Sequence, residues 1–222
     1  MKPYMLKPYM PAPNRFIPYC GALEILFLVL IVLSSLYIYS KTKKIYELSE
    51  HKGIKYFRYG FMCFAISHSF LILHSMLKNM IFKTRILENF FLFEVYSWIY
   101  LTGILFLISS MFSDEINEKY IYFGSLFIFI LGIFFESKFF MIIYSTILII
   151  ILGIISIIKL YKDKKKHFSL IYIIYILVFS SWLVSFVGRI FTNIYVRGNI
   201  INDILRSLIF LYMAYLVNKK LK

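Results

Sequence analysis

Seven ionisable side chains lie within or at the ends of stretches that are otherwise apolar, and these residues are the ones that could do chemistry. They are Glu24, His68, His74, Glu94, Arg189, Asp203 and Arg206. An ionisable group on a helix embedded in hydrocarbon is costly, so each of these residues is a candidate for a functional role.

All of them except His68 fall near one end of the helices predicted below, in the outer third of the membrane. Asp203 and Arg206 are three residues apart, so they share a helix face and can form an ion pair. Opposite charges at one level could line a pocket for a polar or zwitterionic ligand. Two alternatives stay open: the groups pair between helices without a ligand, or their side chains extend to the lipid headgroups.

His68 is predicted to be the deepest ionisable group, near the middle of its helix. Seven residues make nearly two turns, so His68 shares a face with Ser75, and Ser67 shares the neighbouring face with His74. These two polar stripes suit a proton relay or a pH sensor. The alternative is a hydrogen bond from His68 to a neighbouring helix.

The elements that must position these residues follow from hydropathy. The chain is 61% hydrophobic, with a mean hydropathy of +0.78, and its apolar stretches are each about long enough to cross a bilayer. We predict an all-α, polytopic membrane protein, a bundle of seven transmembrane helices. Their predicted ranges are Tyr19–Ser40, Ile54–Leu77, Asn89–Phe112, Lys119–Phe135, Phe139–Leu160, Phe168–Ile190 and Ile200–Val217.

Two boundaries need an argument. A single helix over Tyr120–Ile158 would be roughly 58 Å long, nearly twice a hydrocarbon core, so we expect a hairpin at Glu136-Ser137-Lys138. The first helix is predicted to continue as a polar helix towards Glu50. Gly53 is predicted to take the left-handed position that closes this extension.

The distribution of Lys and Arg predicts the orientation. Fifteen of these 25 residues fall on one side of the predicted bundle and ten on the other. The positive-inside rule then puts the N-terminus outside and the C-terminus inside. The predicted organisation is a Pro-rich extracytoplasmic arm (1–18), one transmembrane domain (19–217) and a basic cytoplasmic tail (218–222).

The same charges predict the partners. Although the net charge is +14, the basic residues lie between apolar stretches rather than along one soluble face. This pattern indicates anionic lipid headgroups at the cytoplasmic face rather than nucleic acid. The basic loops could also bind a membrane or cytoplasmic protein partner.

Small residues recur at helical spacing on three predicted helices and indicate close helix packing. They are Gly103 and Ser110, Gly153 and Ser156, and Ser181, Ser185 and Gly188.

Several kinds of chemistry are not supported. The segment Ile200–Val217 contains no Lys, which excludes a retinal Schiff base there. Bis-His haem ligation needs imidazoles on two facing helices, but both predicted intramembrane histidines share one helix. A zinc site could be assembled only from His74 with Glu24, Glu94 and Asp203, and no hydrolase or nucleotide-binding motif is present. We therefore predict no cofactor, no metal and no enzymatic activity.

The segment His51-Lys52-Gly53-Ile54-Lys55-Tyr56-Phe57-Arg58-Tyr59-Gly60-Phe61 resembles one found in archaeal membrane proteins of about this length. The resemblance covers the first two predicted helices and their turn. It implies the membrane architecture and an archaeal source, and it implies no activity, because none is established for that family.

Three functions remain compatible with these observations. The leading hypothesis is a receptor- or sensor-like protein with a polar ligand pocket near the outer face. The second is a transporter of a small solute or proton that uses His68, Glu94 and Arg189. The third is an assembly or scaffold subunit whose polar groups only pair between helices.

Overall fold

The computed structural model describes residues 17–80, 87–112, 118–134, 138–162, 169–192 and 198–220, and all regular secondary structure in these ranges is α-helical. Seven helices are long and one, α2, is short. Their bounds are α1 (Ile17–Lys41), α2 (Lys43–Ser49), α3 (Lys52–Met80), α4 (Leu87–Ser110), α5 (Glu118–Phe134), α6 (Lys138–Lys162), α7 (Ser169–Thr192) and α8 (Gly198–Lys220).

The predicted helices are confirmed, with ends that differ by a few residues. α5 and α6 are separate helices, as the length argument requires. α1 begins inside the segment predicted as an arm, and α8 continues to Lys220, beyond the predicted end of the domain at 217. The rest of the arm (1–16) and the last two residues of the tail lie outside the described residues.

α2 is the predicted polar extension of the first helix. Hydrogen bonds continue through the turn between α1 and α2, because the Thr42 amide donates to Ile38 O (3.1 Å) and the Tyr46 amide donates to Thr42 O (3.1 Å). The Thr42 hydroxyl also donates to Ile38 O, a side-chain contact that bends helices.

The prediction that Gly53 closes this extension is wrong. The left-handed residue is Glu50, with φ of 50°, and its amide donates to Tyr46 O. Gly53 is helical and lies in the first turn of α3. A Cβ atom at Gly53 would lie 2.8 Å from Ser110 O at the end of α4. The glycine is therefore needed for the close approach of two helices, rather than for a positive φ.

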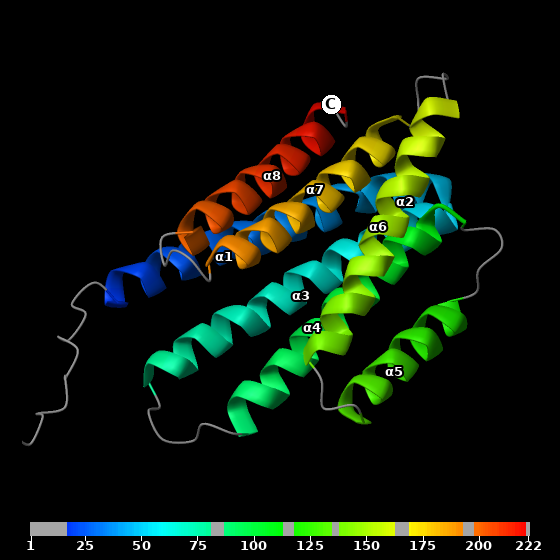
Figure 1. Ribbon diagram of the computed structural model, residues 1–222. Helices are drawn as coiled ribbons and strands as arrows, with labels where there is room; N and C mark the ends of the chain where they lie inside the picture. Colours follow the sequence, from blue (N-terminus) through cyan, green and yellow to red (C-terminus); the bar gives the residue numbers. More distant parts are fainter. Residues whose placement is uncertain are drawn as a thin grey trace, which may run out of the picture.

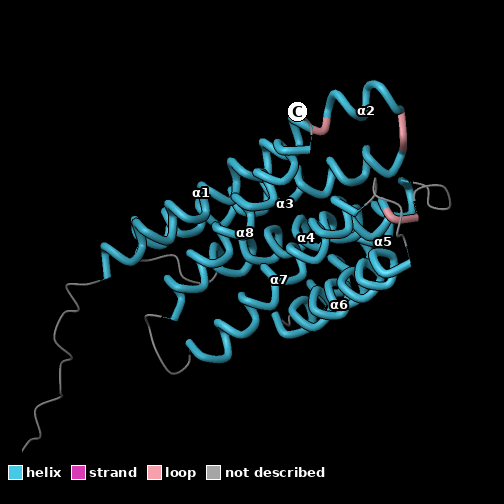
Figure 2. The backbone as a smooth tube through the Cα atoms, turned by 90° about the horizontal axis from the view of Figure 1, so that it is seen from above, coloured by secondary structure: helices cyan, strands magenta, loops and turns pink. Residues whose placement is uncertain are grey.

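The helices form one bundle in which α3 packs between α1 and α4, and α8 packs between α1 and α7 (Figures 1 and 2). α6 packs on α7 and α4, while α5 lies mainly on α4. Successive long helices run in opposite directions, so the start of α1 and the end of α8 lie at opposite ends of the bundle (Figure 1).

Small residues allow the closest helix contacts, as predicted. A Cβ atom at Gly103 of α4 would lie 3.1 Å from Gly60 O of α3, and one at Gly153 of α6 would lie 3.0 Å from the ring of Phe179. Ser110 of α4 hydrogen-bonds the Tyr175 hydroxyl of α7. These contacts bring α3, α4, α6 and α7 together around a core that includes Phe61, Ile104, Leu152 and Val178.

The distribution of polar and apolar side chains is unusual for a protein in water. His68, Ser67, Ser35 and Ser156 are fully buried. Large apolar side chains instead lie on the outer surface of the described helices. Among these are Leu33, Phe123, Ile154, Leu208 and Tyr215.

Two of the described helical segments are long and apolar enough to cross a membrane, Ala22–Ser49 and Lys52–Met76. Three shorter apolar helical segments accompany them, Val95–Ser110, Ile143–Lys159 and Leu170–Phe186.

Candidate functional site at the Arg206–His68 pair

The centre of the candidate site is His68, which lies in the middle of α3 and is 0% exposed. Its Nδ1 atom is 2.8 Å from Phe64 O, one turn earlier on the same helix. A carbonyl oxygen only accepts hydrogen bonds, so Nδ1 must carry the proton and donate it. The ring is thereby oriented by its own helix.

Arg206 of α8 reaches across to this ring. Its Nη2 atom lies 3.0 Å from His68 Nε2, joining residues 138 positions apart in the chain. A guanidinium can only donate, so Nε2 must be the acceptor nitrogen. The two hydrogen bonds together assign His68 as a neutral imidazole with its proton on Nδ1.

The carboxylate of Asp203 partly balances the charge of Arg206. Asp203 Oδ1 lies 4.0 Å from Arg206 Nη1, and both side chains are largely buried, so the two residues share one face of α8, as predicted, and their charges pair. Glu24, exposed on α1, lies close enough to Asp203 for the two negative charges to repel each other. Asp203, Arg206 and the fully buried His68 therefore form a connected polar group.

Aromatic rings surround His68 on its other sides. The rings of Tyr96 and Tyr100 from α4 and of Phe210 from α8 have centroids 6.2, 6.1 and 6.0 Å from that of His68. All three are edge-on to the imidazole, the arrangement that aromatic pairs favour. His68 is thus the point where α3, α4 and α8 meet.

Two buried polar atoms beside the pair have no hydrogen-bonding partner among the described residues. They are Arg206 Nε and Asn202 Oδ1. The two residues are four positions apart, so they lie on one face of α8. One atom is a donor and the other an acceptor, and an unmatched buried group costs roughly 1–3 kcal/mol. A ligand there would need an acceptor for Arg206 Nε and a donor for Asn202 Oδ1.

The structure brings together four of the seven predicted site residues: Glu24, His68, Asp203 and Arg206. His74 is half-buried on α3 and makes no hydrogen bond or ion pair with any other described residue. Glu94 lies in α4 and Arg189 in α7, but their side chains fall outside the described ones. Among the side chains that are described, no group of three His, Cys, Asp or Glu residues could hold a metal ion.

Sequence reasoning missed the contact between Arg206 and His68, because it placed these residues at different depths. The long side chain of Arg206 bridges that difference. It also missed Tyr96, Tyr100, Asn202 and Phe210. The spacing of Asn202 and Arg206 on one helix face was the available signal for Asn202. No pattern in the sequence distinguished Tyr96, Tyr100 and Phe210 from the many other Phe and Tyr residues of the chain.

A separate polar pocket, of about 580 Å³, lies where α2 meets the first turns of α3 and α5. The ion pair between Lys55 Nζ and Glu118 Oε1 (2.5 Å) closes one side of it. The other lining residues are Tyr46, Glu47, Glu50 and Lys52. Lys55 and Glu118 neutralise each other there.

No family model, no curated protein and no solved structure matches this chain. The resemblance of residues 51–61 to archaeal membrane proteins therefore stays a prediction.

Proposed function

We propose that this chain is a seven-span integral protein of the cell membrane, with its N-terminus outside and its C-terminus inside. The apolar outer surface supports this: Phe123 is 70% exposed, Leu33 57% and Ile154 53%. Many large apolar side chains are exposed in this way on the described helices, which is unfavourable in water and favourable in lipid. The excess of Lys and Arg at one end of the bundle supports the orientation.

We further propose that the protein is receptor- or sensor-like, and that it binds a small polar or zwitterionic ligand at Arg206. The single observation that carries this is Arg206 itself: a mostly buried cation that holds α8 to α3 through His68 while its Nε atom has no partner. A carboxylate on the ligand would accept from Nε. An amino group would donate to Asn202 Oδ1.

Such a ligand would alter the contact between two helices that run the length of the bundle. Arg206 lies near the start of α8, and the far end of that helix carries Lys219 and Lys220. A ligand shifts an equilibrium only if it binds one arrangement of the helices better than another. Competition between ligand and His68 for the guanidinium supplies that difference.

Thermal unfolding of the purified protein in detergent or nanodiscs tests this proposal. A panel of free amino acids and small carboxylates is added to the wild type, to Arg206→Lys and to a control, Lys219→Gln, on the same helix. A ligand at 100 times its Kd contributes roughly 2.7 kcal/mol, which raises the Tm of a chain of this size by roughly 5–10 °C.

Arg206→Lys keeps the charge but loses Nε and the planar fork, so it is expected to lose the shift. Lys219→Gln is expected to keep it. If no compound stabilises the wild type, or if Arg206→Lys responds as the wild type does, the ligand site is not at Arg206.

Transport of a small solute or proton is the second candidate function, and the buried polar contacts that join Asp203, Arg206 and His68 support it. Single cysteines placed around His68 should then react with a membrane-impermeant thiol reagent. Protection at every position would exclude a water-filled route.

A further inference from the structure

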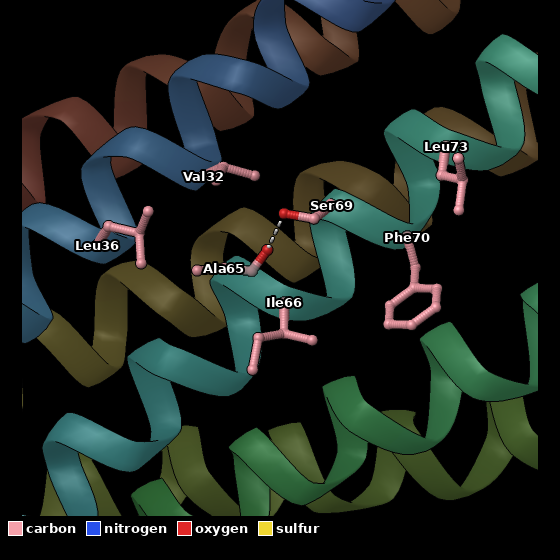
Figure 3. Close-up of a pocket in the computed structure, with 7 residues that line it drawn as sticks. All are labelled: Val32, Leu36, Ala65, Ile66, Ser69, Phe70 and Leu73. Atoms are coloured by element: carbon pink, nitrogen blue, oxygen red, sulfur yellow. Dashed lines mark hydrogen bonds between the residues drawn. The ribbon is translucent and has the colours of Figure 1, made fainter.

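A groove of about 260 Å³ runs along the outer surface between α1 and α3 (Figure 3). From α1, Val32 and Leu36 line it. The α3 residues that line it are Ala65, Ile66, Ser69, Phe70 and Leu73. The small residues Ala65 and Ser69, one turn apart, lie on the side of α3 that faces α1 (Figure 3).

The groove offers no free polar group to an occupant. Ser69 is its one lining residue with a polar side chain, and the Ser69 hydroxyl donates to Ala65 O at 2.9 Å. All other lining side chains are hydrocarbon. An occupant must therefore be apolar along the whole length of the groove, which is about 12 Å from Ala65 to Leu73 at the helical rise per residue.

The shape of the groove favours an extended hydrocarbon chain that lies parallel to the helices. The groove follows the axes of α1 and α3, which is the direction of lipid acyl chains if these helices cross the bilayer. The free volume of about 260 Å³ is small compared with a helix, which is roughly 10–12 Å across with its side chains, so an acyl chain fits the groove better than a helix does.

Basic residues lie beyond one end of the groove. Hydrogen bonding continues from α1 through Thr42 into α2, so Lys43 and Lys44 follow about two helical turns after Leu36, beyond this end of the groove. The Lys43 side chain is 63% exposed and lies 3.5 Å (Nζ to Oε1) from the similarly accessible Glu47, an exposed pair that is weak enough for a phosphate to compete with it. Lys44 beside it is exposed as well. In the proposed orientation this end faces the inner leaflet, where anionic headgroups attract Lys and Arg.

We propose that the α1–α3 groove holds one acyl chain of an anionic phospholipid whose phosphate is bound by Lys43 and Lys44. This inference rests on the proposed membrane location and not on the proposed ligand at Arg206. The lipid would cover the α1–α3 seam and link it to the start of α2.

Native mass spectrometry tests the inference on the full chain, after extraction from nanodiscs that contain phosphatidylglycerol and phosphatidylcholine in equal amounts. The variant Ser69→Phe fills the groove. The matched control is Leu208→Phe, which adds the same ring at an exposed position of α8. If Ser69→Phe fails to fold, Ile66→Trp at the groove rim replaces it.

The wild type and Leu208→Phe should each retain one phosphatidylglycerol in preference to phosphatidylcholine, whereas Ser69→Phe should retain several-fold less. The double variant Lys43→Gln/Lys44→Gln should bind phosphatidylglycerol with a weaker preference over phosphatidylcholine, by roughly fivefold for each lysine removed. The inference is overturned by equal retention of the two lipids, or by equal retention in Ser69→Phe and Leu208→Phe. A dimer that Ser69→Phe dissociates without lipid loss would instead identify a second copy as the occupant, and would also overturn it.

The same preparations separate this inference from the proposed function. Recovery of the chain in the soluble fraction without detergent would contradict the membrane location. A membrane-bound chain without lipid selectivity would contradict the lipid site alone, and the Arg206 thermal shift would remain measurable in Ser69→Phe.

Discussion

At the scale of single residues, the contact between Arg206 and His68 determines what the candidate site can do. Arg206 cannot accept a hydrogen bond, so it stabilises the neutral form of His68 that accepts from it. His68 is therefore better suited to positioning the guanidinium than to carrying a proton in this arrangement. The buried donor at Nε is left without a partner among the described residues, and it is the group that the proposed ligand would have to satisfy.

We expect the Arg206–His68 contact to be energetically coupled. His68→Leu leaves a buried guanidinium donor without its acceptor and should lower the free energy of unfolding by roughly 1–3 kcal/mol. Arg206→Leu should also destabilise, and the double variant should cost less than the sum of the two. Equilibrium unfolding in mixed detergent micelles measures all three.

His74→Leu is the control for this cycle, because His74 is half-buried on the same helix and has no described partner. A change within about 0.5 kcal/mol is expected there. Additive effects of His68→Leu and Arg206→Leu would show that the two residues do not interact in the membrane.

At the scale of elements, α2 depends on few contacts. It has no buried residues. The side chain of Arg58 on α3 contacts it. The Arg58 guanidinium lies 4.7 Å from the ring centroid of Tyr39 and 5.4 Å from that of Tyr46. Its Nε atom donates to Tyr39 O at 3.3 Å. Arg58 thus connects the end of α1, the middle of α2 and the start of α3.

Arg58→Gln should release α2 from this support. A cation–π contact is worth roughly 0.5–2 kcal/mol, so the amides of α2 should exchange with solvent several-fold faster while those of α3 change little. Hydrogen exchange followed by mass spectrometry measures this. Lys44→Gln, an exposed change on α2 itself, should leave exchange as in the wild type, and equal acceleration in both variants would contradict the role of Arg58.

The close packing of α3 against α4 gives a second prediction, which concerns Gly53. Gly53→Ala places a methyl group 2.8 Å from Ser110 O, a backbone atom that cannot move without α4. We expect a loss of stability of roughly 1–3 kcal/mol, as for overpacking. Thermal unfolding of the purified variant measures this loss.

Gly124→Ala is the matched control, since nothing lies within 4 Å of an added Cβ there. This change should be neutral, or should stabilise α5 by up to about 1 kcal/mol through helix propensity. Similar effects of Gly53→Ala and Gly124→Ala would mean that α3 and α4 do not approach closely at this point.

At the scale of the whole molecule, the alternation of seven long helices places the start of α1 and the end of α8 at opposite ends of the bundle. In a membrane, the two termini must therefore lie on opposite sides. Epitope tags at both ends, probed in intact and permeabilised cells, should show the N-terminal tag from outside and the C-terminal tag only after permeabilisation. Both tags on one side would contradict seven spans, and a reversed pattern would contradict only the orientation.

Local patterns in the sequence were enough to predict the helices. Apolar stretches long enough to cross a bilayer predicted seven long helices, and the length limit separated α5 from α6 correctly. Asp203 and Arg206 were correctly placed on one helix face, because residues three apart on a helix have a known separation. These predictions held since each depends on neighbours within one helix.

Contacts between helices were decided by the tertiary structure alone. Hydropathy gives the depth of a residue but not the direction its side chain takes, so it could not predict that Arg206 reaches His68 or that Tyr96, Tyr100 and Phe210 enclose the imidazole. The error at Gly53 has the same cause. Its role depends on Ser110, 57 positions away, and only the packing of α3 on α4 brings that carbonyl within reach.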